Sequence, residues 1–416
     1  MKTRLMMLVL LLQVVVVKAQ EKLDLATILK QIEQQNPQLK MYDAEIKSMD
    51  EMAKGAKDWE SPQLGTGLWM VPYNTSMWRR GMDGSTGMGQ YAISLEQMFP
   101  NKSNLNANAK LMETASSVEL ENKKGVAFNL FSLAKQNFVE WKLAKEKAKV
   151  LEQNQQLLSF MIRSTEIRYK NGLEKLNTYY KAKAALANIE NMQLMLQNDI
   201  KQNRIMLNTL MNRNKLSNFD IDTVYPQKQY QSSLYDSTTL ANHRSDIKAI
   251  VQSIVLNGLE QAVEKSMLKP EFGVKYEHMF GFGGMPMQYS LMGMIKIPVA
   301  WSTKSERANI EGLKWRSEAL RQEKDMLLSE IRGRAFGKVS ELQTKEKQLK
   351  LFEQQIIPAF RKNYQSLQLA YEQNTAELFM LFDAWESLNM IQLNYIDLQK
   401  EYLKMQIELD RILELR

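Results

Sequence analysis

Four short segments of the chain alternate between apolar and polar residues, and they occur as two pairs. The alternation is clearest near Phe272 and Tyr289, where aromatic and aliphatic residues take one face and charged residues the other. A period of two is typical of β-strands, and strands of about ten residues suit a tilted membrane crossing. The pattern therefore predicts two β-hairpins, at about residues 64–99 and 271–297. A soluble hairpin that buries one face on a core is the alternative explanation.

Elsewhere the apolar residues recur at helical spacing over very long stretches. The segment from Lys102 to Arg168 contains no proline, and as one helix it would be about 100 Å long. A second such stretch runs from Thr303, with Pro358 as its only proline. Helices of this length favour coiled-coil packing. We expect two long helical hairpins, with their turns near residues 168–178 and 370–380.

The order of these elements occurs twice. Asn36-Pro37-Gln38-Leu39 precedes Pro62 by the same spacing at which Arg244-Ser245-Asp246-Ile247 precedes Pro270. A repeat of about half the chain is too long for a solenoid and indicates one duplicated structural unit. We therefore divide the chain into a signal peptide, a first repeat, a connecting equatorial segment and a second repeat, at residues 1–19, 20–215, 216–238 and 239–416.

The N-terminus and the composition narrow the function. A basic start at Lys2 and Arg4, an apolar run and the sequence Val17-Lys18-Ala19 predict a cleaved secretory signal. The chain has no cysteine and only two histidines, which argues against thiol catalysis, a catalytic triad and a Cys/His metal site. It also lacks a Walker-type loop and a basic cluster with interleaved aromatic residues. We expect no enzyme activity, no cofactor and no nucleic-acid partner.

Four strands cannot close a membrane barrel, because the smallest such barrels have eight. An open sheet in lipid would leave backbone groups without hydrogen bonds at both edges, at several kcal/mol for each group. The chain is therefore expected to oligomerise, and three copies would give twelve strands and an even, closed sheet.

These features together resemble the TolC-like outer membrane factor family, and the likeness extends over essentially the whole mature chain. The tip motif of that family, Tyr-x-x-Gly followed by Ala-x-x-x-Leu, has its first match at Tyr169, Gly172, Ala182 and Leu186. The other segments that carry the resemblance are Leu23-Asp24-Leu25-Ala26, Asn36-Pro37-Gln38-Leu39, Ser61-Pro62-Gln63-Leu64, Gln97-Met98-Phe99-Pro100, Ile297-Pro298 and a second tip motif at Tyr371, Asn374, Ala384 and Leu388.

The resemblance implies a mainly α protein with a membrane β part, assembled as a homotrimer. A twelve-stranded β-barrel in the outer membrane of a Gram-negative bacterium would continue into an α-helical barrel in the periplasm. The protein would be the passive exit duct of a tripartite efflux pump, with outer membrane lipids around its barrel. Its partners would be a periplasmic adaptor protein and an inner-membrane transporter of the resistance-nodulation-division type. The adaptor would contact the helix tips at Tyr169, Asn171, Gly172, Tyr371 and Asn374.

Family members close the periplasmic end with acidic residues after the second tip. Asp383 lies at one such position, whereas Met380 stands where an acidic residue is often found. Lys181 is the equivalent of Asp383 in the first repeat. The resemblance implies a gate with one ring of Asp383, bonded to Lys181 or Tyr180 across the helix pairs, and an apolar constriction at Met380. A solvated carboxylate is the alternative for Asp383.

The chain contains 27 methionines, and several gather in the two hairpins. The alternation places Met279, Met292 and Met294 on the charged face, with Lys275 and Lys296. A thioether is a soft ligand that suits Cu(I) and, by the same argument, Ag(I). We therefore consider copper or silver ions as one cargo of the duct. The alternative is that methionine simply replaces leucine as a flexible packing residue.

The sequence is also compatible with two other functions. A duct for type I protein secretion would have the same architecture. A secreted coiled-coil structural protein would account for the helices, but it leaves the alternating hairpins unexplained.

Overall fold

The computed structural model describes residues 21–172, 175–225, 228, 230 and 236–416 of the chain. The segment that carries the predicted signal peptide lies outside these residues. The chain divides into two compact units, one formed by the residues up to Met41 with Lys124–Arg244 and Ser329–Arg416, the other by Tyr42–Lys123 and Ser245–Leu328.

A pair of consecutive helices precedes each of the two β-hairpins. Asp24 caps the first helix by accepting a hydrogen bond from the Thr27 amide (3.1 Å), and Asp236 accepts one from the Thr238 amide (3.4 Å) at the corresponding place. Both first helices end in extended backbone, at Asn36 (ψ 127°) and Arg244 (ψ 130°). The helices are α2 (Leu25–Gln35), α3 (Pro37–Lys54), α6 (Ser237–His243) and α7 (Ser245–Met267).

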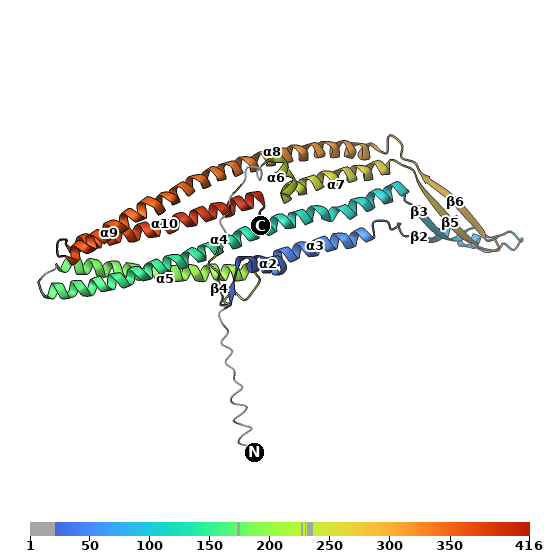
Figure 1. Cartoon of the computed structure of the whole chain (residues 1–416). Helices are drawn as coiled ribbons and strands as arrows, with labels where there is room; N and C mark the ends of the chain where they lie inside the picture. The colour runs from blue at the N-terminus through green and yellow to red at the C-terminus, as the bar shows by residue number, and fades with distance from the viewer. Residues whose placement is uncertain (1–20, 173–174, 226–227, 229, 231–235) are drawn as a thin grey trace, which may run out of the picture. The chain divides into compact units, whose positions relative to one another are not determined.

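The predicted hairpins form one antiparallel sheet in the second unit (Figure 1). The strand order is β2–β3–β5–β6, so the second strand of the first hairpin pairs with the first strand of the second hairpin. The connection between β2 and β3 includes a short 3₁₀-helix, Thr75–Trp78. The strands are β2 (Gln63–Trp69), β3 (Gln90–Phe99), β5 (Glu271–Gly281) and β6 (Gln288–Lys296).

The register confirms the predicted faces of the sheet, because directly paired residues project to the same side. One side, here called the apolar face, carries Leu64, Leu68, Tyr91, Ile93, Leu95, Phe272, Val274, Tyr276, Phe280, Tyr289, Leu291 and Ile295. The other, the polar face, carries Ser94, Glu96, Met98, Glu271, Lys275, Glu277, Met279, Ser290, Met292, Met294 and Lys296. The apolar face is strongly exposed, with Tyr289 at 74% and Leu291 at 68%.

The long helical hairpins form close to their predicted positions. The second of them differs from the prediction of one uninterrupted helix across Pro358, because a π-helical turn at Phe352–Ile356 divides its first arm. Proline has no amide hydrogen and its ring crowds the preceding turn, so a wider turn just before it relieves the conflict. The helices are α4 (Lys102–Lys170), α5 (Leu176–Leu210), α8 (Lys304–Leu351), α9 (Ile357–Glu372) and α10 (Leu378–Leu413).

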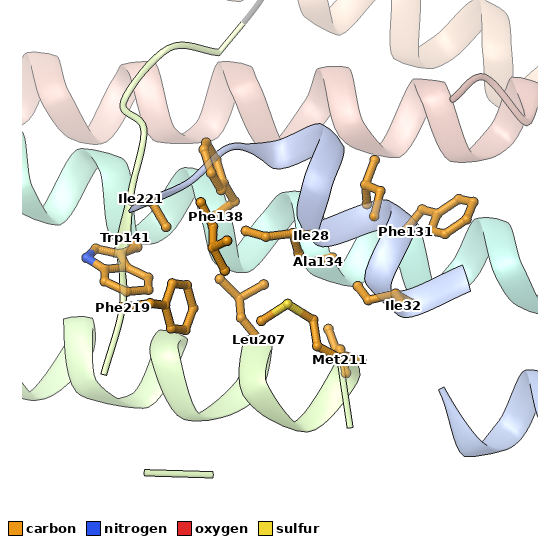
Figure 2. Packing of buried hydrophobic residues seen from close by; sticks show 13 residues of the cluster. Ile28, Ile32, Phe131, Ala134, Phe138, Trp141, Leu207, Met211, Phe219 and Ile221 are labelled. Atoms are coloured by element: carbon orange, nitrogen blue, oxygen red, sulfur yellow. The ribbon is translucent and has the colours of Figure 1, made fainter. Parts of the chain in front are cut away.

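The first unit contains a hydrophobic core that joins α2, α4 and α5 (Figure 2). Phe138 is fully buried there, and Trp141 packs edge-to-face on Phe219 with a ring-centroid distance of 5.1 Å. Burial of one such side chain stabilises a fold by about 1.5–3 kcal/mol. A two-residue parallel pairing of β1 (Lys22–Leu23) with β4 (Asp220–Ile221) borders this core. The pairing fixes Lys22 and Leu23, which precede α2, against a segment that follows α5.

None of the helices in the described residues has an apolar stretch long enough to cross a membrane.

Candidate functional site

The two helical hairpins turn with the same backbone geometry at the tips. Gly172 has a φ of +71° and Asn374 a φ of +59°, which is the left-handed region. The Gly172 amide donates to the Tyr169 carbonyl (2.9 Å), and the Asn374 amide donates to the Tyr371 carbonyl (3.0 Å). Glycine is the usual residue at this position after a helix and asparagine the common substitute. Asn374 therefore preserves the turn although it departs from the glycine of the first tip.

The side chain of Asn374 also makes a contact that glycine cannot make. The guanidinium nitrogens of Arg168 lie 3.3 and 3.4 Å from the Asn374 Oδ1 atom, and the Arg168 Cζ atom lies 5.0 Å from the Tyr371 ring centroid. These hydrogen bonds are long and exposed, so each is weak. Arg168 thus connects the first tip to the second, a role that sequence reasoning missed because its partners lie some 200 positions away.

The other predicted residues of the first tip, Tyr169 and Asn171, lie at the end of α4. Tyr169 is 43% exposed, and the Asn171 side-chain amide donates to the Ile167 carbonyl of its own helix (2.8 Å). A polar recess opens between the two tips. Its lining is Arg168, Gly172, Lys175, Asn177, Thr178, Tyr371, Asn374, Thr375, Ala376, Glu377, Leu378 and Phe379. Three of the five predicted tip residues, Gly172, Tyr371 and Asn374, thus line one polar surface with both charge signs, while Asn171 bonds to the end of its own helix.

Replacement of Asn374 separates its two roles. Asn374→Ala keeps a β-carbon in a left-handed turn but removes the side-chain amide that makes this conformation tolerable for asparagine, so we expect a loss of about 1 kcal/mol in the free energy of unfolding. Asn374→Gly keeps the turn and removes only the acceptor for Arg168, so its stability should stay within a few tenths of a kcal/mol. Urea unfolding of the two purified variants measures the difference. Equal losses in both would show that the Arg168 contact, and not the backbone, carries the stability of this tip.

The residues predicted for the gate lie at the start of α5 and α10. The Lys181 ammonium nitrogen lies 4.5 Å from the Phe379 ring centroid and 4.6 Å from that of Phe382. It also lies 3.6 Å from Glu386 Oε2. The intrachain partner of Lys181 is therefore Glu386, one turn beyond Asp383, and a Lys181–Asp383 contact does not form within one chain. A contact between chains stays a prediction.

The remaining gate residues are exposed on α5 and α10. Asp383 is exposed and, among the described residues, forms neither a hydrogen bond nor an ion pair. Met380 is 54% exposed and Tyr180 is 61% exposed. A surface with one free carboxylate, a thioether and a phenol is thus available to whatever faces this end of the hairpins.

A buried cluster fixes the orientation of that surface. Leu378, Leu381, Phe382 and Trp385 recur at helical spacing and pack with residues of α4 and α5. The Trp385 indole nitrogen donates to Asn154 Oδ1 (2.7 Å) inside the cluster. Since these positions face inward, the intervening Met380 and Asp383 face outward.

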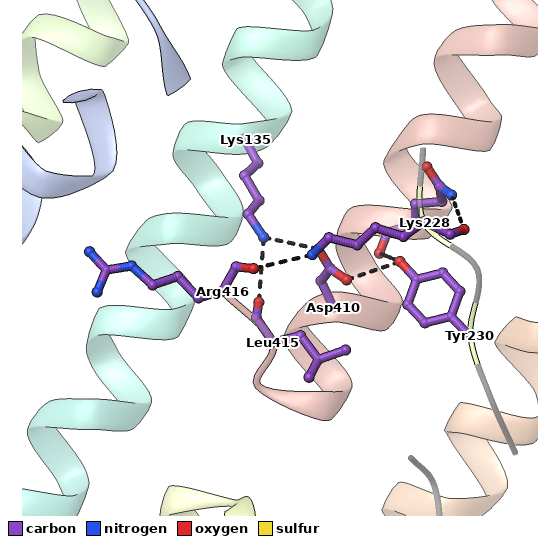
Figure 3. A network of polar contacts seen from close by, with 7 residues as sticks. Lys135, Lys228, Tyr230, Asp410, Leu415 and Arg416 are labelled. Carbon is purple, nitrogen blue, oxygen red and sulfur yellow. Dashed lines mark hydrogen bonds and ion pairs between the residues drawn. The ribbon is translucent and has the colours of Figure 1, made fainter. Parts of the chain in front are cut away.

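A second polar group, buried in the same unit, connects α4 with the end of α10 (Figure 3). Asp410 Oδ2 accepts hydrogen bonds from Lys135 (2.9 Å) and Lys228 (2.8 Å), and Asp410 Oδ1 accepts one from the Tyr230 hydroxyl (2.9 Å). The Lys135 and Asp410 side chains are only 5% and 3% exposed. Burial lowers the pKa of Lys135 although Asp410 opposes this, and burial together with Asp410 raises the pKa of Tyr230. Sequence reasoning did not identify this cluster.

The structure places the three candidate metal ligands on the polar face, as the alternation predicts. Met292 pairs with Lys275 and Met294 with Gly273, whereas Met279 pairs with Gln288. Met279 therefore lies four strand positions from Met292, about 13 Å along the sheet. The register brings Met292 and Met294 together and separates Met279 from them. Within the described residues no group of three His, Cys, Asp or Glu side chains could hold a metal ion.

Comparisons with known proteins agree with this architecture. The family model described as "Outer membrane efflux protein" matches residues 28–213. The solved structure of VceC from Vibrio cholerae is 16% identical with a TM-score of 0.73, and the match covers 94% of this chain and 95% of that one. The structure of CusC is 14% identical with a TM-score of 0.73, and the match covers 94% of this chain and 91% of that one. The structure of CmeC from Campylobacter jejuni is 12% identical with a TM-score of 0.71, and the match covers 94% of this chain and 85% of that one. A search of curated proteins finds no match. The resemblance and the fold class inferred from the sequence are confirmed.

Proposed function

We propose that this chain, a relative of the outer membrane efflux proteins, is the passive outer membrane exit duct of a tripartite efflux pump. The observation that carries the proposal is the four-stranded sheet, whose apolar face is exposed on one chain. The outer edges of its two edge strands, β2 and β6, have no strand partner among the described residues. An apolar face opposite a charged face fits a membrane wall around an aqueous lumen. As a passive duct, the protein would only enclose a path for its substrate and open or close it, so we assign it no catalytic role.

The unpaired edges support assembly as a homotrimer. Strand β2 of one chain would pair with β6 of the next, and three chains would close twelve strands into a barrel. Closure removes the exposed backbone groups that make an open sheet costly in lipid. The long helical hairpins would extend the same tube into the periplasm.

Cell fractionation tests this assembly. The protein is expected in the outer membrane as a trimer that dissociates on heating in detergent. Recovery as a soluble periplasmic rod would overturn the proposal and favour the alternative, a secreted coiled-coil structural protein.

The tips supply a surface for partners. The recess between Arg168, Tyr371 and Asn374 presents positive, aromatic and amide groups at the turns of both hairpins. We assign it to the hairpin end of a periplasmic adaptor protein, behind which an inner-membrane transporter of the resistance-nodulation-division type supplies the energy. A type I secretion transporter is the alternative energy source. Crosslinking from a photoreactive residue at position 171 in cells would identify which transporter system is captured with the adaptor.

The gate is assigned to Asp383 and Met380, with Tyr180 and Lys181 beside them. In a trimer three Asp383 carboxylates would face one another at the periplasmic end, where they would attract cations and hold an ordered ring of water. Their exposure and lack of an intrachain partner support this role.

The Asp383→Ala variant is expected to raise the conductance of reconstituted trimers severalfold and to increase leakage of small molecules in cells. The matched control is Glu386→Gln, which removes the intrachain partner of Lys181 and should leave conductance close to that of the parent. Unchanged conductance in the Asp383 variant would contradict the gate.

The cargo could belong to one of two classes, soft metal ions or amphiphilic compounds such as bile salts, dyes and drugs. Methionines on the polar face support soft metal ions, Cu(I) or Ag(I), as cargo. Growth of a deletion strain on graded copper and silver, beside bile salts, dyes and drugs, distinguishes the classes. Selective sensitivity to the metals would support metal export, whereas sensitivity to the amphiphiles alone would make the duct a general exit and the methionines packing residues.

A further inference from the structure

Two methionines from different hairpins meet across one glycine on the polar face. In the register, Gly273 of β5 lies directly between Met98 of β3 and Met294 of β6. Directly paired residues project to the same side of a sheet, so the three positions form one row across three strands. The central position of this row has no side chain.

Because Gly273 has no side chain, the thioether groups of Met98 and Met294 can both lie over its α-carbon. A β-carbon built on Gly273 would lie 2.2 Å from the Met98 sulfur and 3.2 Å from the Met294 methyl carbon. Both thioether ends therefore occupy the space above the glycine. Met292 projects from β6 two positions away, on the same face.

The charges around this row are balanced, which argues against a hard cation. The next row contains Glu96 opposite Lys275, and the outer row contains Glu271 in an ion pair with Lys296 (3.0 Å). His278 belongs to the apolar face, opposite Ile93. The row itself thus offers neutral sulfur ligands, with no net negative field to attract Mg²⁺ or Ca²⁺, which prefer oxygen ligands.

We propose that the Met98 and Met294 thioethers, with Met292 beside them, form a binding site for one soft monovalent cation, Cu(I) or Ag(I). Two neutral sulfur ligands suit a soft d¹⁰ ion and would hold it weakly enough to exchange. The flexible methionine side chains can adjust their sulfur separation when the ion enters. The site is a property of the isolated protein, and only its position inside a pore rests on the proposed function.

The test uses detergent-purified protein labelled with ¹³C in the methionine methyl groups and titrated with silver nitrate in chloride-free buffer. We expect the Met98 and Met294 methyl signals to shift first, with binding of one Ag⁺ per chain. Met98→Leu and Met294→Leu should each weaken this binding by about tenfold or more, since even changes outside the ligand shell of a metal site have such effects. The matched control is Met326→Leu, which replaces a methionine that is 63% exposed on α8 and should bind as the parent does.

A second variant keeps both sulfurs and changes only their spacing. Gly273→Ala places a methyl group where the Met98 sulfur now lies, so it should weaken silver binding as much as loss of a ligand does. Simultaneous shifts of all methionine signals, or parental binding by the Met98→Leu/Met294→Leu double variant, would overturn the site. Neither result would affect the duct itself, whose test is trimer assembly in the outer membrane.

Discussion

Replacement of Asp410 by alanine is expected to lower the free energy of unfolding by about 3–5 kcal/mol. The carboxylate accepts hydrogen bonds from Lys135, Lys228 and Tyr230, so its removal leaves the Lys135 ammonium buried without a countercharge. With a side chain only 5% exposed, Lys135 cannot reach water without displacing the surrounding helices. The loss should appear as a lower urea midpoint at fixed protein concentration.

Two further variants show whether the buried charge is the cause. The double variant Lys135→Met/Asp410→Leu removes both buried charges and should recover most of the lost stability, because apolar residues replace such pairs at little cost. Lys228→Met removes a side chain that is 33% exposed and should have a much smaller effect than Asp410→Ala. A double variant no more stable than Asp410→Ala would show that the hydrogen bonds of Asp410, and not charge balance, hold the end of α10.

The second large effect is expected at Trp385. Trp385→Ala removes a nearly fully buried side chain from the cluster that holds the first turns of α10, which should lower stability by about 3–5 kcal/mol. Met380 and Asp383 face outward only because this cluster faces inward. On the gate proposed above, the variant should also increase small-molecule leakage, to a level comparable with Asp383→Ala. Unfolding and conductance measured on the same preparation test both parts.

A conservative change separates packing from hydrogen bonding at this position. Trp385→Phe keeps an aromatic ring beside Phe382 but leaves the Asn154 acceptor without its indole donor. An unpaired buried acceptor costs about 1–3 kcal/mol, so this variant should be intermediate in stability and remain closed. Leakage in the phenylalanine variant equal to that of the alanine variant would contradict the packing argument.

The periodicity of the sequence was enough to predict the regular elements. Strand alternation identified both faces of the sheet, and helical spacing identified the long hairpins with their turns. The π-helical turn at Phe352–Ile356 was not predicted, because Pro358 can be accommodated by a kink, a break or a wider turn, and neighbouring helices decide between them. The pairing of β1 with β4 was also missed, since two residues on each side carry no periodic signal.

Contacts between the repeats were beyond prediction from one sequence. Arg168 contacts Asn374 and Lys181 contacts Glu386, and neither local pattern specifies which turn of the opposite hairpin lies nearby. The alternation placed Met279, Met292 and Met294 on one face but could not give their spacing, and the register of β3 and β6 on β5 brings Met98 and Met294 to either side of Gly273. A one-residue slip in that register would send every one of these side chains to the other face.

The pairing of β3 with β5 also implies an order for folding of the sheet within one chain and its pairing with other chains. Ten residue pairs join the two hairpins inside one chain, whereas β2, the edge strand that would meet a neighbouring chain, has only seven residues. In the proposed trimer, β6 of one chain would pair with β2 of the next, again joining the second strand of one hairpin to the first strand of another, but over fewer residues than the β3–β5 pairing. A newly exported chain would therefore complete its own sheet first and recruit neighbours afterwards. Maturation would then pass through a folded single chain in which the outer edges of β2 and β6 are still unpaired.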